Sequence, residues 1–222
     1  MEEKKDIIKK SLGCRLFQGI VTGLAYITFR PKVFWQDDSL KHPNKNSKYV
    51  FVCNHTHHFD AIFVASVLKK YKPYMLVMTK WYNKKRIGTL IQWMRSIPID
   101  LNSMDSSWYT NCETALKNGS SVLIFPEGAV ARDGKMLEFK PGAGMLSAKD
   151  GVDVVPVAIY GKYDMLFGKR QKIMVGKPIK SNCPEDMRHS KYAKQLMKTA
   201  ESDVKCMYNS MVEKYGDIGT YY

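Results

Sequence analysis

Short apolar runs alternate with segments of helical apolar spacing along most of this chain. The runs are too short for helices and are rich in β-branched and aromatic residues, so each is expected to form a buried strand. The predicted strands are Tyr49–Cys53, Tyr74–Thr79, Ser96–Asp100, Ser121–Phe125, Asp153–Tyr160 and Lys172–Gly176. The predicted helices are Ala61–Lys70, Asn83–Arg95, Asp105–Asn118, Ala143–Lys149 and Pro184–Tyr215. This alternation predicts an α/β fold with a mixed, largely parallel sheet flanked by helices, in which Pro156 favours an edge or bulge position.

A polar cluster follows the first predicted strand, where the chain passes into a helix. Asn54 and His55 come directly after the strand, and Asp60 follows five residues after the histidine. Active sites of α/β proteins lie at such junctions. Residues five apart in one helix are separated by roughly 140° around its axis, so His55 has to lie in the entering loop for Asp60 to reach its ring. A carboxylate on one imidazole nitrogen then suits a general base that takes a proton from a substrate hydroxyl.

Two other interpretations of this cluster stay open. His57 and His58 could join His55 in a metal site, but a metal needs three or four ligands, and the other histidines are only His42 and His189. The cluster could also be an ordinary helix cap, with Asp60 merely favourable near the positive end of the helix dipole.

The first 35 residues combine a short apolar run with basic and aromatic flanks. The run Leu16–Phe29 has 14 residues, about 21 Å as a helix, against roughly 30 Å for a bilayer core. The basic flanks are Lys4, Lys5, Lys9, Lys10, Arg15, Arg30 and Lys32. We expect residues 1–35 to form an amphipathic helical segment in the interface of an anionic membrane, and residues 36–222 to form the α/β domain. A helix packed on the domain is the alternative for the first segment.

Charge and cysteine usage restrict the partners and the compartment. The 35 Lys and Arg residues exceed the 21 Asp and Glu residues, for a net charge of +14, so anionic partners are expected. The lysines form no recognisable nucleic-acid motif, so we expect no nucleic acid partner. Five cysteines without a CxxC pair are typical of free thiols in a reducing compartment. With no evident cleavable signal, this predicts a protein at the cytoplasmic face of a membrane, peripheral or monotopic.

The order of motifs between about Val50 and Gly176 resembles the glycerolipid acyltransferase family, which includes the bacterial lysophosphatidic acid acyltransferases. Asn54-His55 with Asp60 is similar to the first block of that family, a histidine followed after four residues by an aspartate. The later blocks correspond to Ser96-Ile97-Pro98-Ile99-Asp100, Phe125-Pro126-Glu127-Gly128 and Val155-Pro156-Val157-Ala158. Each tetrad alone is a weak signal, and the set in this order is specific.

The resemblance implies the reaction. His55 would be the base that deprotonates an acceptor hydroxyl, Asp60 would orient it, and the hydroxyl would attack an acyl thioester of coenzyme A or acyl carrier protein without an acyl-enzyme. It implies no cofactor and no metal, and a lysolipid acceptor, by default 1-acylglycerol-3-phosphate, for phospholipid biosynthesis. The substrate-binding residues would be Asn54, Glu127, Gly128, Arg132 and Lys140.

Several of these roles have alternatives. Glu127 could bind a glycerol hydroxyl or hold an arginine, or it could be a turn carboxylate that satisfies backbone amides. A backbone N–H near Gly128 could serve as an oxyanion donor. Lys140 precedes a glycine-flanked helix start, which can receive an anion or be a plain turn and cap.

Two positions depart from the family pattern. Family members usually carry arginines where this chain has Leu101 and Val130, and both arginines are associated with the acceptor phosphate. Losing two guanidinium groups removes strong charge-assisted bonds, for which Arg132, Arg95 and Lys140 are the candidate replacements. The alternatives are therefore an acyltransferase for an acceptor without a phosphate, or a catalytically silent lipid-binding member of the fold.

Overall fold

The structure, a computed structural model, describes residues 12–103, 105–131, 135–163 and 169–216. Within these ranges seven strands form one sheet in the order β1-β7-β6-β2-β5-β3-β4. The strands are β1 (Lys32–Trp35), β2 (Val50–Cys53), β3 (Tyr74–Met78), β4 (Ser96–Ile99), β5 (Val122–Ile124), β6 (Val154–Tyr160) and β7 (Lys172–Val175). All neighbouring strands are parallel except β6 and β7. The predicted mixed, largely parallel α/β sheet is confirmed.

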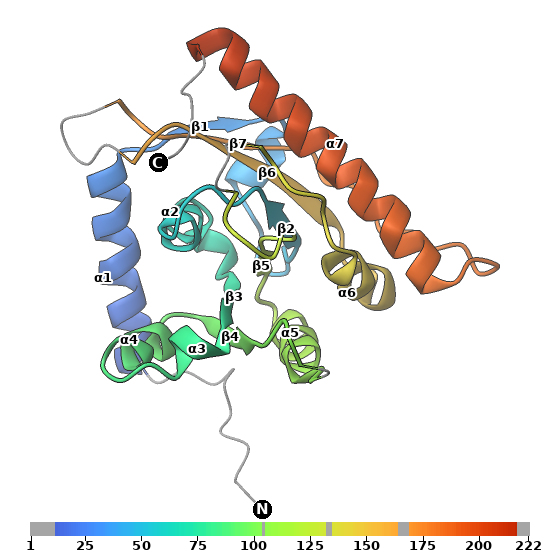
Figure 1. Cartoon of the computed structure of the whole chain (residues 1–222), viewed down its shortest axis with the longest axis horizontal. Coiled ribbons are helices and arrows are strands. Elements are labelled where there is room, and N and C mark those ends of the chain that lie inside the picture. Colours follow the sequence, from blue (N-terminus) through green and yellow to red (C-terminus); the bar gives the residue numbers. More distant parts are fainter. Residues whose placement is uncertain (1–11, 104, 132–134, 164–168, 217–222) are drawn as a thin grey trace, which may run out of the picture.

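Helices cover both faces of the sheet (Figure 1). They are α1 (Leu12–Phe29), α2 (Asp60–Val67), α3 (Thr79–Tyr82), α4 (Ile87–Trp93), α5 (Ser107–Lys117), α6 (Gly142–Asp150) and α7 (His189–Tyr215), with 3₁₀ turns η1 (Asp38–Lys41) and η2 (Lys69–Tyr71). Successive strand residues point to opposite faces, so the fully buried β2 contributes to two cores. Val50 and Val52 pack in the core under α5, α6 and α7, whereas Phe51 and Cys53 pack in the core under α1 and α2.

Two features of the sheet differ from the sequence predictions. Residues Lys32–Trp35, predicted within the N-terminal helical segment, form the edge strand β1 and pair with β7. Pro156, predicted at an edge or bulge, lies in β6, which is paired on both sides. The β6–β7 ladder stops at Val157 and Val175, and Pro156 O accepts from Gly176 N at 2.8 Å. The N and O of one strand residue face the same side, so the Pro156 nitrogen faces β7 at the point where that strand has already ended. The N–H that proline lacks would therefore have had no strand partner there.

The helices begin later than their sequence patterns predict in two places. The predicted helix 83–95 is the shorter α4, preceded by α3, and the predicted helix 184–215 starts at His189.

The first helix is longer than the apolar run that predicted it. At 18 residues, about 27 Å, α1 is long and apolar enough to cross a membrane by length and composition alone.

Candidate active site

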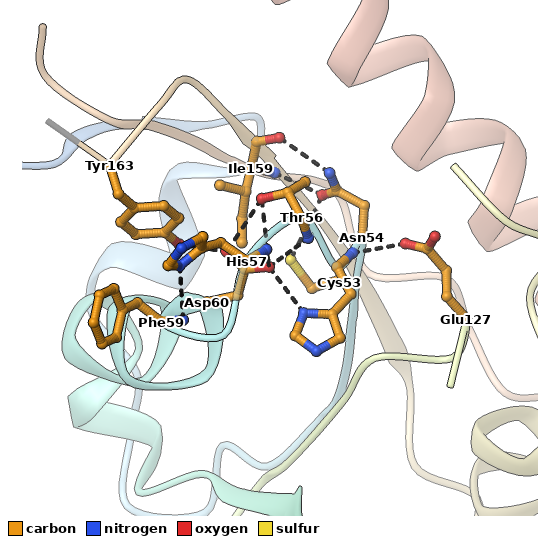
Figure 2. Close-up of polar contacts among 10 residues, drawn as sticks. Cys53, Asn54, Thr56, His57, Phe59, Asp60, Glu127, Ile159 and Tyr163 are labelled. Carbon is orange, nitrogen blue, oxygen red and sulfur yellow. Dashed lines mark hydrogen bonds and ion pairs between the residues drawn. The ribbon is translucent and has the colours of Figure 1, made fainter. Parts of the chain in front are cut away.

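The junction between β2 and α2 is fixed by Asn54. This buried side chain donates from Nδ2 to Ile159 O at 3.1 Å and accepts at Oδ1 from Ile159 N at 2.8 Å, which ties the end of β2 to β6 (Figure 2). Its amide is therefore used to position the loop that follows, and His55 is the next residue. The polar cluster lies at the carboxyl edge of the parallel strands, as the sequence predicted.

His55 and Asp60 form the predicted pair. The distance from His55 Nδ1 to Asp60 Oδ2 is 2.9 Å, and Asp60 is fully buried at the first turn of α2, whereas the His55 side chain is 19% exposed. A carboxylate accepts hydrogen bonds, so Nδ1 carries the proton and donates. Nε2 is then the nitrogen with a free lone pair, which a general base requires.

The Asp60 carboxylate is held by donors from two parts of the chain (Figure 2). The amides of Thr56 and His57 donate to Oδ2 at 2.5 and 2.8 Å, and the Thr56 hydroxyl donates to Oδ1 at 3.2 Å. The Tyr163 hydroxyl, 103 residues further on, also donates to Oδ1. Burial and the neighbouring Asp60 raise the Tyr163 pKa well above its usual range, so this hydroxyl stays protonated and donates.

The backbone of His55 is clamped by the loop after β5. Its N–H donates to Glu127 Oε1 at 2.6 Å, and its carbonyl accepts from Ala131 N at 2.9 Å. The other oxygen of Glu127 accepts from Leu137 N at 2.7 Å. Both carboxylate oxygens thus accept from backbone amides, which is the role of a turn carboxylate that the sequence left open. Burial raises the Glu127 pKa, and the two amide bonds oppose this shift.

The His55 ring lies between Phe125 and a cavity. The two rings stack with centroids 4.4 Å apart and an interplanar angle of 26°. A cavity of about 270 Å³ is lined by Asn54, His55, Thr56, Glu127, Ala131, Lys135, Met136, Lys205, Tyr208 and Asn209. The stacking restricts the ring while the cavity leaves room for a substrate group beside it. This arrangement suits proton abstraction from a bound hydroxyl.

The other predicted binding residues lie at varied positions. Gly128 has φ +72°, and its N–H donates to Phe125 O at 3.1 Å, so that amide closes the turn rather than facing a substrate. Lys140 extends over this turn, where its Nζ lies 2.7 Å from the position of a Cβ on Gly128. Arg132 lies outside the described residues. Arg95 lies at the opposite edge of the sheet, stacked over Tyr74 at the start of β3, and therefore does not reach His55.

Nearby Cys and His side chains do not take over the chemistry of His55. Burial, together with Asp60 and Glu127, raises the Cys53 pKa well above its usual range, so its thiolate is not available as a nucleophile. His57 Nδ1 accepts from Phe59 N at 3.2 Å, and burial lowers the His57 pKa. Within the ranges that the structure describes, no group of three or more His, Cys, Asp or Glu side chains could hold a metal ion.

The fold and the site define an α/β protein that presents a carboxylate-oriented histidine to a cavity, as an enzyme using a general base does. The family model described as Acyltransferase matches residues 35–160, more than half of the chain. The chain belongs to this acyltransferase family, which confirms the resemblance seen in its motifs.

The curated relatives that match this chain are named for the same activity. The chain is 33% identical over 123 residues to "1-acyl-sn-glycerol-3-phosphate acyltransferase LPAT1, chloroplastic" of Arabidopsis thaliana, a match that covers 54% of this chain and 33% of the relative. It is 26% identical over 137 residues to the 1-acyl-sn-glycerol-3-phosphate acyltransferase of Bacillus subtilis, which covers 60% of this chain and 68% of the relative. This chain spans about a third of the length of the plant relatives that it matches.

A solved structure shares the fold over nearly the whole chain. The 1-acyl-sn-glycerophosphate acyltransferase PlsC of Thermotoga maritima superposes with a TM-score of 0.66, covering 92% of this chain and 81% of that one. The identity is 19%, so this likeness shows the fold alone.

Sequence reasoning did not find Tyr163, or the cavity residues that α7 supplies. Tyr163 follows β6 without a motif of its own, and Lys205 belongs to a lysine-rich helix whose pattern indicates only a solvated face. The aromatic cluster around Tyr163 forms only in the folded chain, where its ring contacts Phe29, His57 and Phe63.

We expect Tyr163→Phe to lower kcat about tenfold with little change in KM. The variant removes one hydrogen bond to the carboxylate that orients His55, and bonds to charged groups contribute on the order of 1.5 to 3 kcal/mol. Steady-state kinetics of thioester turnover would measure both constants. Tyr26→Phe, which changes an exposed ring on α1, serves as the control. An unchanged kcat in Tyr163→Phe would show that Asp60 needs no support from this hydroxyl.

Proposed function

We propose that this protein is a membrane-associated O-acyltransferase that transfers a fatty acyl group from a thioester to the hydroxyl of a lysolipid, 1-acylglycerol-3-phosphate, in phospholipid biosynthesis. The observation that carries the proposal is the His55–Asp60 pair beside the cavity. Family membership and the names of the relatives support the acceptor.

The reaction follows from the protonation of the pair. Nε2 of His55 takes the proton of the acceptor hydroxyl as its oxygen attacks the thioester carbonyl carbon. A carbon–oxygen bond forms, the carbon–sulfur bond breaks, and the departing thiolate takes the proton from the imidazolium. Asp60 stabilises the imidazolium in between. No acyl-enzyme and no cofactor are needed.

The donor is a thioester of coenzyme A or acyl carrier protein. Both candidates are acidic, through the phosphates of the first and the protein surface of the second, and the net charge of +14 favours either. No disulfide joins the five cysteines, which all lie in the described ranges, and this is consistent with a cytoplasmic location.

The outward face of α1 supports membrane contact. Its polar residues Gln18 and Thr22 face the protein, where Gln18 Nε2 donates to Trp93 O at 2.6 Å and Thr22 Oγ1 donates to Gln18 O at 2.7 Å. Apart from Arg15, the exposed side chains are apolar or aromatic, namely Leu12, Leu16, Ile20, Leu24, Tyr26 and Ile27. A helix on a water-facing surface places its apolar side chains inward and its polar side chains outward, and α1 does the opposite. An exposed apolar stripe of this length marks an interaction site.

The same apolar surface continues onto α4. Phe17 of α1 contacts Trp93 edge to face at 5.5 Å, and Ile87, Leu90 and Trp93 are each more than 40% exposed. Residues 61–99 contain no acidic residue and eight basic ones, four of them in Lys80, Lys84, Lys85 and Arg86 beside α4. Apolar side chains with basic neighbours fit an anionic lipid surface.

The triple variant Leu16→Gln, Ile20→Gln, Leu24→Gln is expected to lower binding to anionic vesicles at least about a hundredfold. Burial of one such side chain contributes about 1.5 to 3 kcal/mol. Vesicle sedimentation would measure binding, with Leu137→Gln, an exposed apolar residue outside this surface, as the control. Deleting residues 1–35 is a poorer test because it removes β1 and the buried Phe29. Undiminished binding by the triple variant would refute the assignment of α1 to the membrane.

The reaction itself is tested by thiol release from acyl-coenzyme A and acyl carrier protein, with lysolipid acceptors that carry or lack a phosphate. We expect turnover that requires 1-acylglycerol-3-phosphate. A second candidate function, acylation of an acceptor without a phosphate, is favoured by Leu101, which is 40% exposed two residues after the end of β4, and by Val130. Turnover only with phosphate-free acceptors would establish that second function.

A further inference from the structure

The cavity beside His55 carries positive charge from two distant segments. Lys135 comes from the loop after β5 and Lys205 from α7, and both line the cavity. Tyr208 and Asn209, on the next turn of α7, also line it. Two lysines therefore line the cavity beside the residue that would deprotonate the acceptor.

Two acidic residues lie near these lysines and offset part of their charge, but both are engaged by other groups. Glu127 is the one acidic residue lining the cavity within the described part of the chain, and each of its oxygens accepts a backbone N–H. Glu201 pairs with Lys205, with Oε1 and Nζ 2.5 Å apart. This exposed pair lies within one helix and leaves the other two N–H bonds of the ammonium group for a ligand.

A second bond of Glu201 connects the two lysine-bearing segments. Its Oε2 accepts from Phe139 N at 2.9 Å, which ties α7 to the segment that follows Lys135. The buried Phe139 side chain packs in the core with Val204, the neighbour of Lys205. The two segments that carry the lysines are thus connected by a hydrogen bond and by the shared core.

We propose that Lys135 and Lys205 bind the phosphate monoester of the acceptor lysolipid in this cavity. The proposal rests on the proposed function and names the groups that select its substrate. A phosphate monoester carries about two negative charges at neutral pH, and its oxygens can accept charge-assisted hydrogen bonds from both lysines. The cavity is smaller than the roughly 300 to 1,000 Å³ of sites for drug-sized ligands, so it suits a glycerophosphate head group and not an acyl chain.

The other candidate cations are placed differently. Arg95 lies at the opposite edge of the sheet, and Lys140 lies over the Gly128 turn and is not among the cavity residues. Val130 directly precedes Ala131, which lines the cavity, and it stands at the position where the family pattern has an arginine associated with the acceptor phosphate. The lysines supply that contact from elsewhere in the fold.

Direct binding tests the cavity without requiring catalysis. Titration calorimetry at low salt would use sn-glycerol 3-phosphate as the probe, with wild type, Lys135→Gln, Lys205→Gln and the double variant. We expect the affinity to fall about tenfold for each single variant and about a hundredfold for the pair. Lys205→Arg, which keeps the charge, should retain most of the affinity. Lys194→Gln is the matched control, an exposed lysine three turns earlier on the same face of α7.

Kinetics distinguish the acceptor phosphate from the phosphates of coenzyme A. The double variant should raise KM for 1-acylglycerol-3-phosphate without changing KM for acyl-coenzyme A, and thermal unfolding should match wild type. A raised KM for the donor alone would overturn the proposal and assign the cavity to the donor. Equal affinity of wild type and the double variant for glycerol 3-phosphate would also overturn it. If wild type binds this probe but turns over no lysolipid, the proposed function fails while the phosphate site stands.

Discussion

Replacing His55 with alanine is expected to lower the rate of thioester turnover by a factor of about 10² to 10⁴, the usual contribution of a general base. The reason is geometric, since Asp60 occupies Nδ1 and leaves Nε2 of a half-buried ring to take the proton of the acceptor. The loss should appear in kcat, because the variant keeps the cavity residues that bind the acceptor. Thiol release at saturating acceptor measures this effect.

The neighbouring His58 provides the control for this experiment. His58→Ala removes an exposed imidazole three residues away, outside the Asp60 network, and should keep nearly full activity. Equal rates for wild type and His55→Ala would remove the general-base mechanism. Absence of turnover in wild type itself would instead leave a lipid-binding protein of the acyltransferase fold.

Asp60→Asn is expected to reduce both stability and activity. The buried carboxylate accepts from two backbone amides, the Thr56 and Tyr163 hydroxyls and the His55 ring. Asparagine offers one acceptor oxygen in place of two, and its NH₂ group faces donors that then lack a partner. We expect a loss of about 3 kcal/mol in the free energy of unfolding. For a chain of this size that lowers Tm by about 6 to 12 °C.

Thermal unfolding and kinetics at a temperature where the variant is folded separate the two effects. Turnover should fall at least about a hundredfold, because without the carboxylate neither the tautomer nor the orientation of His55 is fixed. Asp153→Asn is the comparison, a half-buried carboxylate that accepts from the exposed Lys180 and from Ser181 N, and it should change stability by about 1 kcal/mol or less. A Tm for Asp60→Asn equal to that of wild type would contradict this account of the network.

The Asp60 carboxylate organises the loop before α2 and does not cap the helix, whose N-cap, Phe59, has no side-chain cap bond. The carboxylate accepts from the amides of Thr56 and His57 in that loop, and the same oxygen bonds the His55 ring. The loop amides fix the carboxylate, and the fixed carboxylate orients the imidazole. One carboxylate therefore both fixes the loop and orients the ring that would act as the base.

The limits of the sequence predictions have physical causes. The buried strands were predictable because their apolar runs are short and β-rich, but β1 carries the exposed and half-buried pattern of an edge strand and has no such run. The prediction for Pro156 was wrong because the rule that confines proline to edge strands assumes that the neighbouring strand pairs along the whole strand. Here β7 ends beside Pro156. The start of α7 depends on tertiary packing, since its sequence from Pro184 is equally compatible with a helix.

What the sequence alone determined is local. The α/β alternation, the junction after β2 and the loop position of His55 relative to Asp60 follow from side-chain periodicity and from the five-residue spacing. The tertiary structure decided what holds and surrounds that pair. Glu127 clamps the His55 backbone from 72 residues away, Tyr163 reaches Asp60 from 103 residues away, and α7 brings Lys205 to the cavity. Periodicity is a property of neighbouring residues, whereas these contacts exist only once the sheet has placed the ends of separate strands at one edge.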